Sequence, residues 1–380
     1  MPNRNSSPPY RWAFARHALE DGDFFRKYFK IKELVKGYGD LEVKYSNVIK
    51  PFKRLKLLGM TLITIILLTL VSGFLYEYTS YKNVKSNYPP DGQMIDVGDR
   101  EIHMNIKGTK TSLPPVVIET GTGNWSYDWS NIQKELSKHT QVITYDRAGY
   151  GWSDPPPNGF SIDTTINDLS KILESSKIDT PVILVGHSVG GIYSRLFTEK
   201  YPEKVSGLVL VDSRNEYFSE QAKSFNDKFF ETQDQSMNRI LSQIGIVRLF
   251  GENMFSDSMP NYLSAKKYVN VHWDTSFFKV LNEEIKQIKS NEKLLEGTRS
   301  LGDKPLTIIT PSDVELQATE LGFSEQEADS FEKIWMDSQK KLTNLSTNSE
   351  FILVPNSSHS VMYDQPDVII KAILKMADEI

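Results

Sequence analysis

The chain has 380 residues, enough for one large or two ordinary domains, and its 39% hydrophobic and 24% charged residues are ordinary for a folded protein. It has no cysteine, which excludes disulfides, thiolate metal sites and a cysteine nucleophile. The net charge of −5 is unevenly spread, because residues 1–56 carry 13 Lys and Arg against 6 Asp and Glu.

A stretch without charges, LLGMTLITIILLTLVSGFLY at 57–76, follows this basic segment. As a helix it spans about 30 Å, the thickness of a bilayer core. The alternative is the buried core helix of a soluble domain, which would usually show a polar stripe. A cleaved signal peptide fits poorly, because the preceding region is very long and no small-residue cleavage site follows. The pattern favours a transmembrane helix, and it makes a nucleic-acid-binding arm the weaker interpretation of the basic N-terminus.

The charges on either side of this stretch predict its orientation. Lys50, Lys53, Arg54 and Lys56 precede it, and Glu77 is the first charge after it. The positive-inside bias puts the N-terminus in the cytoplasm and the residues beyond about 77 outside the cell membrane. We therefore expect a single-pass signal anchor, with a cytoplasmic segment at 1–56 and a linker at 77–89. The cytoplasmic segment is expected to form interfacial helices on the inner leaflet or a loosely ordered tail.

The region 90–380 begins with alternating strands and helices. Two short strands with a Gly-Asp turn are expected within 93–108, and apolar strands follow at 114–119, 141–146, 181–186 and 205–212. Helical spacing of apolar residues separates the later strands, at 131–140, 166–178 and 190–201. This alternation predicts an α/β fold with a mostly parallel sheet and helices on both faces.

The alternation stops between about 213 and 303 and then resumes. The intervening stretch has a helical pattern, and such a long insertion exceeds an ordinary connection. We expect a lid over a site, since Phe and Met are frequent in it; a packed helical decoration is the alternative. Beyond it we expect a strand at 305–310, a helix at 324–345, a strand at 350–355 and a final helix at 366–380.

The sequence GHSVG at 186–190 lies where the strand 181–186 meets the helix 190–201. It matches the pattern G-x-S-x-G, in which a serine occupies a sharp strand-to-helix turn and its neighbours must be glycines to avoid collisions. The N-terminus of the following helix suits a site where negative charge develops. The strand, turn and helix around the motif make Ser188 a candidate nucleophile.

These features resemble the α/β-hydrolase superfamily over about residues 90–380. Four stretches look like successive landmarks of that family and come in its order: YDRAGYGWSD at 145–154, VGHSVGG at 185–191, GLVLVD at 207–212 and NSSHSVMYDQPDVI at 356–369. The resemblance implies an α/β-hydrolase fold with a catalytic triad and no metal or other cofactor.

A serine nucleophile needs a base and a carboxylate that orients the base. The resemblance assigns the base to His359, which lies between the last strand and the last helix. The other five histidines are expected elsewhere: His17 across the membrane, His103 in the early hairpin, His139 at a helix end, His272 in the insertion and His187 turned away from the serine.

The acid and the oxyanion hole are less directly indicated. Similar enzymes place the acid after either of two strands, here those at 205–212 and 305–310, so that Asp212 and Asp313 are the candidates. We favour Asp212, because it lies directly at the end of its strand. One oxyanion donor is expected from the backbone N–H of Val189 and the other from Thr122 in the TGTG loop, where many relatives carry His-Gly.

The expected function is that of a membrane-anchored serine hydrolase acting on esters or related, preferably apolar, acyl compounds. A serine nucleophile disfavours the haloalkane dehalogenases and epoxide hydrolases of similar fold, which use aspartate there. Peptidase, thioesterase, lipase and acyltransferase activities stay open, as does a non-catalytic receptor or scaffold. We expect no nucleotide, metal or nucleic-acid site. The glycines of GTGNW resemble a phosphate-binding loop only weakly, because the Lys-Ser/Thr that such a loop requires is missing.

Overall fold

The computed structural model of the protein describes residues 42–222, 225, 233–255, 259–312 and 323–380. The chain divides into two compact units, residues 1–69 and 70–380. Helix α2 (Glu42–Lys82) begins in the first unit and ends in the second. Its part Lys53–Lys82 is long and apolar enough to cross a membrane.

The helix extends beyond the predicted span. Residues 77–82 continue α2, and a short helix α3 (Val84–Asn87) follows, so most of the segment that we expected as a linker is helical. The composition changes at Glu77, but no glycine or proline interrupts the chain before Pro89 and Pro90. A change from apolar to polar residues ends a membrane span without ending a helix.

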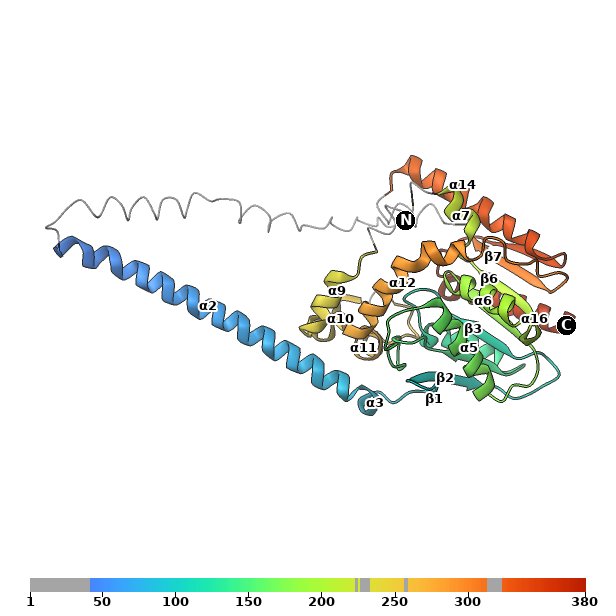
Figure 1. The fold of residues 1–380 in the computed structure, drawn as a ribbon, viewed down its shortest axis with the longest axis horizontal. Helices are drawn as coiled ribbons and strands as arrows, with labels where there is room; N and C mark the ends of the chain where they lie inside the picture. Colours follow the sequence, from blue (N-terminus) through green and yellow to red (C-terminus); the bar gives the residue numbers. More distant parts are fainter. Residues whose placement is uncertain (1–41, 223–224, 226–232, 256–258, 313–322) are drawn as a thin grey trace, which may run out of the picture. The chain divides into compact units, whose positions relative to one another are not determined.

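The second unit is built on one mixed sheet of eight described strands in the order β1-β2-β4-β3-β5-β6-β7-β8 (Figure 1). The first two ladders, β1–β2 and β2–β4, are antiparallel and all others are parallel. The strands are β1 (Gln93–Asp96), β2 (Glu101–Lys107), β3 (Val116–Glu119), β4 (Val142–Tyr145), β5 (Val182–His187), β6 (Val205–Val211), β7 (Leu306–Pro311) and β8 (Ser349–Val354).

The central strands bury both faces, as a parallel sheet between two helical layers requires. Along β5, Val182 and Leu184 belong to one hydrophobic cluster, and Ile183 and Val185 belong to the other. The helices α5 (Ile162–Ser175) and α6 (Gly190–Lys200) contribute to the first cluster, and α4 (Ser130–Leu136) and α16 (Pro366–Glu379) contribute to the second. The predicted α/β fold with helices on both faces is confirmed.

A helical insertion separates β6 from β7, at the place expected from the sequence. Its described elements are α7 (Glu216–Gln221), α9 (Ser236–Gln243), α10 (Ile246–Phe255), α11 (Ala265–Lys267), a π-helical turn (Tyr268–His272) and α12 (Thr275–Lys293). Helices α14 (Glu325–Lys341), α15 (Val361–Asp364) and α16 complete the domain (Figure 1). The insertion is helical as predicted, and its action as a lid stays a prediction.

Candidate active site

Ser188 occupies the turn between β5 and α6. Its φ of 53° lies in the left-handed region, which costs a residue other than glycine about 1–2 kcal/mol. The segment after β6 stabilises this conformation, because the N–H of Ser188 donates to the carbonyl of Val211 over 3.0 Å and the N–H of Arg214 donates to the carbonyl of Ser188 over 3.0 Å. The chain therefore holds one serine in a strained position at the end of a buried strand.

The glycines around Ser188 provide space. A Cβ atom on Gly186 would lie 2.7 Å from Gly191 Cα, and one on Gly190 would lie 2.5 Å from the carbonyl oxygens of Glu119 and Thr120. A Cβ on Gly191 would overlap the hydroxyl of Ser213. None of the three has a positive φ, so close backbone approach, rather than conformational freedom, requires glycine here.

His359 and Asp212 lie together beside this turn. The Nδ1 of His359 and the Oδ2 of Asp212 are 2.6 Å apart, and Asp212 is fully buried at the end of β6. The second carboxylate oxygen, Oδ1, accepts a hydrogen bond of 2.7 Å from the indole N–H of Trp335 on α14. Because Asp212 accepts at both oxygens, its carboxylate is fixed toward His359. Asp313, the alternative acid, lies outside the described residues.

His187 stabilises the loop that carries His359. Its Nε2 lies 3.0 Å from the carbonyl oxygen of His359, and the two rings are 4.7 Å apart. Burial lowers the pKa of His187 to about 3, so this ring is neutral and donates through Nε2. In the described part of the chain no hydrogen bond joins the Ser188 hydroxyl to His359; such contacts are often long in enzymes without substrate.

The two expected oxyanion donors lie on segments that adjoin Ser188. Val189 is the N-cap of α6, a position whose N–H has no partner within the helix. Thr122 lies in the loop after β3. The preceding residue, Gly121, lies so close to His187 that a Cβ atom on it would be 2.7 Å from His187 Nδ1. Neither amide donates to a protein acceptor among the described residues.

The geometry of this turn agrees with comparisons to known proteins. The family profile described as the alpha/beta hydrolase fold matches residues 114–243, which include the turn at Ser188. The chain has the α/β-hydrolase fold. It is 32% identical over 124 residues to a 2-hydroxy-6-oxo-2,4-heptadienoate hydrolase from Pseudomonas putida, a match that covers 32% of this chain and 44% of that protein. The profile covers the part of the chain that carries Ser188, and together with this relative it establishes the fold.

A longer match is more distant. A probable transporter from Hormonema carpetanum is 22% identical over 303 residues, which covers 74% of this chain and 42% of that protein. The chain spans about half the length of the first curated relatives that it matches, or less.

Solved structures share the fold of the hydrolase domain. An epoxide hydrolase from Vigna radiata is 17% identical with a TM-score of 0.59, and covers 76% of this chain and 98% of its own. An esterase from Thermogutta terrifontis is 18% identical with a TM-score of 0.52, and covers 76% and 99%. These two enzymes have different chemistries on one fold, so the similarity establishes the architecture alone.

A buried ionic cluster braces the loop at 120–123, which we call the oxyanion loop after its expected donor Thr122. The guanidinium of Arg147 donates to the carbonyl oxygens of Thr120 over 2.6 Å and Gly121 over 2.9 Å. The carboxylates of Glu119 and Glu284 pair with it at 2.9 and 3.0 Å. Burial raises the pKa of Glu119 to about 7, although Arg147 opposes this shift. Arg147, which lies in the landmark stretch 145–154, therefore braces the loop beside the site.

His272 links the insertion to the same loop. Its Nδ1 accepts from the backbone N–H of Gly151 over 3.0 Å, so Nε2 carries the proton and donates to the carbonyl of Gly123 over 2.9 Å. The ring also stacks on Trp125 with centroids 4.8 Å apart. Burial lowers the pKa of His272 to about 4. We expected this histidine only to lie in the insertion; the sequence carries no signal for its contact with the loop.

The two neutral histidines predict that acid destabilises the domain. A histidine in an unfolded chain titrates near 6.5, whereas the folded values are about 3 for His187 and about 4 for His272. Below pH 6.5 the unfolded chain therefore binds more protons, and the free energy of unfolding falls as the pH drops towards 4. Replacing His272 by Gln should make the melting temperature less dependent on pH between 7.5 and 5; an unchanged dependence would contradict this origin.

Trp335 donates a hydrogen bond to the candidate acid Asp212, a contact that sequence reasoning missed. Trp335→Phe keeps most of the volume but removes the donor to Asp212, so we expect kcat to fall on the order of 10-fold, the worth of one hydrogen bond to a charged group, while KM changes little. Phe331→Leu, on the same helix and packed on Trp335, is the matched control. Equal effects of both variants on kcat would show that packing alone matters.

Possible metal ligands are not clustered among the residues that the structure describes. No group of three or more His, Asp or Glu side chains that could hold a metal ion occurs among the described residues.

Proposed function

We propose that this chain is a membrane-anchored serine hydrolase that cleaves carboxylic esters through an acyl-enzyme on Ser188. The observation that carries the proposal is the 2.6 Å contact between His359 Nδ1 and the buried carboxylate of Asp212, beside a serine held in a strained turn. A carboxylate on Nδ1 leaves Nε2 free to accept the serine proton, which is the arrangement of a catalytic triad.

The reaction follows from these positions. Ser188 Oγ attacks the ester carbonyl while His359 Nε2 takes the hydroxyl proton, and Asp212 stabilises the resulting imidazolium. The amides of Val189 and Thr122 bind the oxyanion of the tetrahedral intermediate, and each donor contributes about 3 kcal/mol to the barrier reduction. His359 then protonates the departing alcohol, and a water molecule, deprotonated by the same ring, releases the acid from Ser188.

The insertion supports an apolar acyl substrate. A Cβ on Gly123, in the oxyanion loop, would lie 3.9 Å from the side chain of Leu281 on α12, and one on Gly149 would press on Val280 of the same helix. The buried face of α12 also includes Phe277 and Ile285, so it meets these loops with hydrocarbon beside the buried carboxylate of Glu284, which pairs with Arg147. Hydrocarbon packed against the loops of a site favours substrates that bury a methylene chain.

A panel of p-nitrophenyl esters tests this function. The full chain in detergent micelles should release p-nitrophenol with acyl chains of several lengths, and an initial burst would report the acyl-enzyme. Amide substrates of the same acyl groups distinguish a peptidase, and added alcohol acceptors distinguish an acyltransferase. Turnover of amides without turnover of esters would contradict the proposal.

Membrane anchoring is the second part of the proposal. It is supported by the apolar stretch of α2 and by the basic residues before it. The orientation places the N-terminus in the cytoplasm and the hydrolase domain outside the cell membrane. Because the chain has no cysteine, Glu350→Cys on β8, where the side chain is 42% exposed, can be labelled selectively. A membrane-impermeant maleimide should label it in intact cells, and labelling only after lysis would contradict the orientation.

A further inference from the structure

The hairpin formed by α9 and α10, residues 236–255, carries a high proportion of the exposed large hydrophobic side chains of the domain. Five of the nine exposed large hydrophobic side chains described beyond residue 82 lie on these two short helices: Met237, Ile240, Leu249, Phe250 and Met254. Exposed fractions reach 54% for Phe250 and 70% for Met254. A concentration of this kind marks an interaction surface, whereas scattered exposed apolar residues need no explanation.

The orientation of α10 is fixed by its opposite face. The guanidinium of Arg248 pairs with the carboxylate of Glu77 on α2 through contacts of 2.7 and 2.8 Å, and it also donates to the carbonyl of Asn270 over 2.7 Å. A Cβ on Gly251 would lie 2.6 Å from Val269. With Arg248 and Gly251 facing inward, helical geometry directs Leu249, Phe250 and Met254 outward. We call these three side chains the apolar face of α10.

The hairpin also contacts α2 within the predicted membrane span. A Cβ on Gly73 would overlap the carbonyl oxygen of Ile244, and Gly245, with φ of 74°, forms the left-handed turn between α9 and α10. Gly73 lies three residues before the end of the span at Tyr76, which is about 4.5 Å along a helix. If the span ends at Tyr76 as predicted, the turn of the hairpin lies at the depth of the headgroups or just beneath them.

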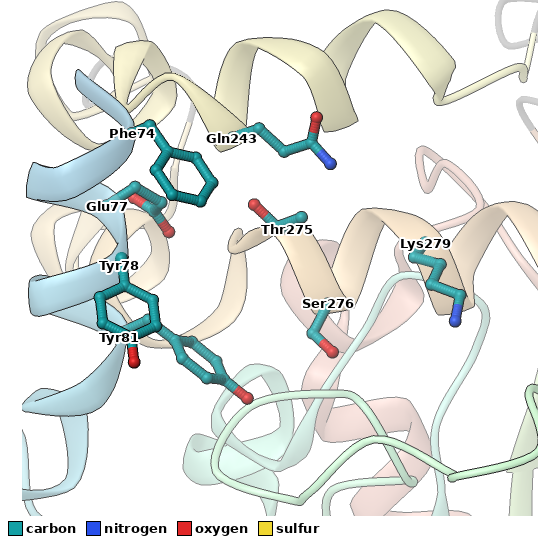
Figure 2. A pocket seen from close by; sticks show the side chains of 8 residues that line it. All are labelled: Phe74, Glu77, Tyr78, Tyr81, Gln243, Thr275, Ser276 and Lys279. Atoms are coloured by element: carbon teal, nitrogen blue, oxygen red, sulfur yellow. The ribbon is translucent and has the colours of Figure 1, made fainter. Parts of the chain in front are cut away.

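A pocket of about 310 Å³ between α2 and the insertion is a second sign that these elements pack together. Phe74 and Tyr78 of α2 line it together with Gln243 of α9 and Thr275 of α12 (Figure 2). The last two turns of α2 are thus part of the hydrolase domain. Because the hairpin packs on the last turns of α2, it lies next to the membrane surface at the point where α2 leaves the membrane.

We propose that the apolar face of α10 lies in the outer interface of the lipid bilayer and forms a second attachment beside α2. The proposal rests on the membrane anchoring proposed above. Amphipathic helices of this kind bury their apolar face about 5–10 Å into the boundary of headgroups and acyl chains. The contact fixes the insertion, and with it α12, at the bilayer surface, where a substrate with an acyl chain enters from the lipid.

Single cysteines test the depth of each part, because the chain has none of its own. Phe250→Cys, and separately Met254→Cys, are labelled with an environment-sensitive fluorophore in the full chain, reconstituted in phosphatidylcholine vesicles. The emission should shift to the blue and be quenched by lipids that carry a nitroxide near the headgroup. Leu353→Cys on β8, which is also apolar and 51% exposed, is the matched control and should not be quenched.

A label at Leu67 separates this proposal from the anchoring on which it rests. Quenching of Leu67→Cys by a nitroxide deep in the acyl chain, without quenching at positions 250 and 254, would overturn the second attachment alone. No quenching at Leu67 would overturn the anchoring itself. Cross-linking between F250C copies in place of quenching would assign the face to a second copy of the chain and would also overturn the proposal.

Discussion

Replacing Ser188 by alanine is expected to lower kcat on the order of 10⁶-fold, because removing a triad nucleophile costs about as much as removing the whole triad. The residual rate comes from the oxyanion amides and substrate binding. Initial rates on the preferred p-nitrophenyl ester measure the loss.

Stability provides the control for this variant. Ser188 has a φ of 53°, and alanine carries the same Cβ atom in that position, so the melting temperature should stay close to that of the parent chain. A folded Ser188→Ala protein that keeps more than a few per cent of the rate would exclude Ser188 as the nucleophile.

Replacing Asp212 by asparagine is expected to lower kcat on the order of 10⁴-fold. The asparagine amide would donate toward His359 Nδ1 and would favour the tautomer that carries its proton on Nε2, which cannot accept a proton from the serine. The indole N–H of Trp335 donates to Oδ1 over 2.7 Å, so the amide oxygen can occupy that position and the amide nitrogen then faces His359.

Asp313→Asn is the comparison for Asp212→Asn. Asp212 is the carboxylate that contacts His359 in the structure, so the Asp313 variant should keep nearly full activity. Loss of activity in the Asp313 variant together with an active Asp212 variant would reverse the assignment of the acid.

The sequence indicates those features of the candidate site that are local. The glycines of 186–191 indicate a crowded turn, because each must leave space for a neighbour within the same strand–turn–helix unit. Asp212 was a good candidate because the carboxyl ends of parallel strands meet at one edge of the sheet. His359 lies far from Ser188 in sequence, and its place came from the order of the family landmarks and not from any local pattern.

The contacts that tie distant elements together could not be predicted. Trp335 reaches Asp212 because α14 packs against β7, the strand next to β6 in the sheet. The sequence around Trp335 shows only an apolar position on an amphipathic helix. His272 and Arg248 depend likewise on how the insertion folds over the oxyanion loop and α2. Such tertiary contacts leave no periodicity, because each involves one side chain. The helical segment 77–82 was missed since hydropathy locates a membrane span and not a helix end.

Labelling with a fluorophosphonate probe tests the central claim most directly, because the probe phosphonylates a serine only where a base activates it. The account predicts one adduct, on Ser188 in the peptide that contains GHSVG, and its absence from the Ser188→Ala and His359→Ala proteins. A folded, unlabelled parent chain, or an adduct on another serine, would contradict the assignment of Ser188 as the nucleophile.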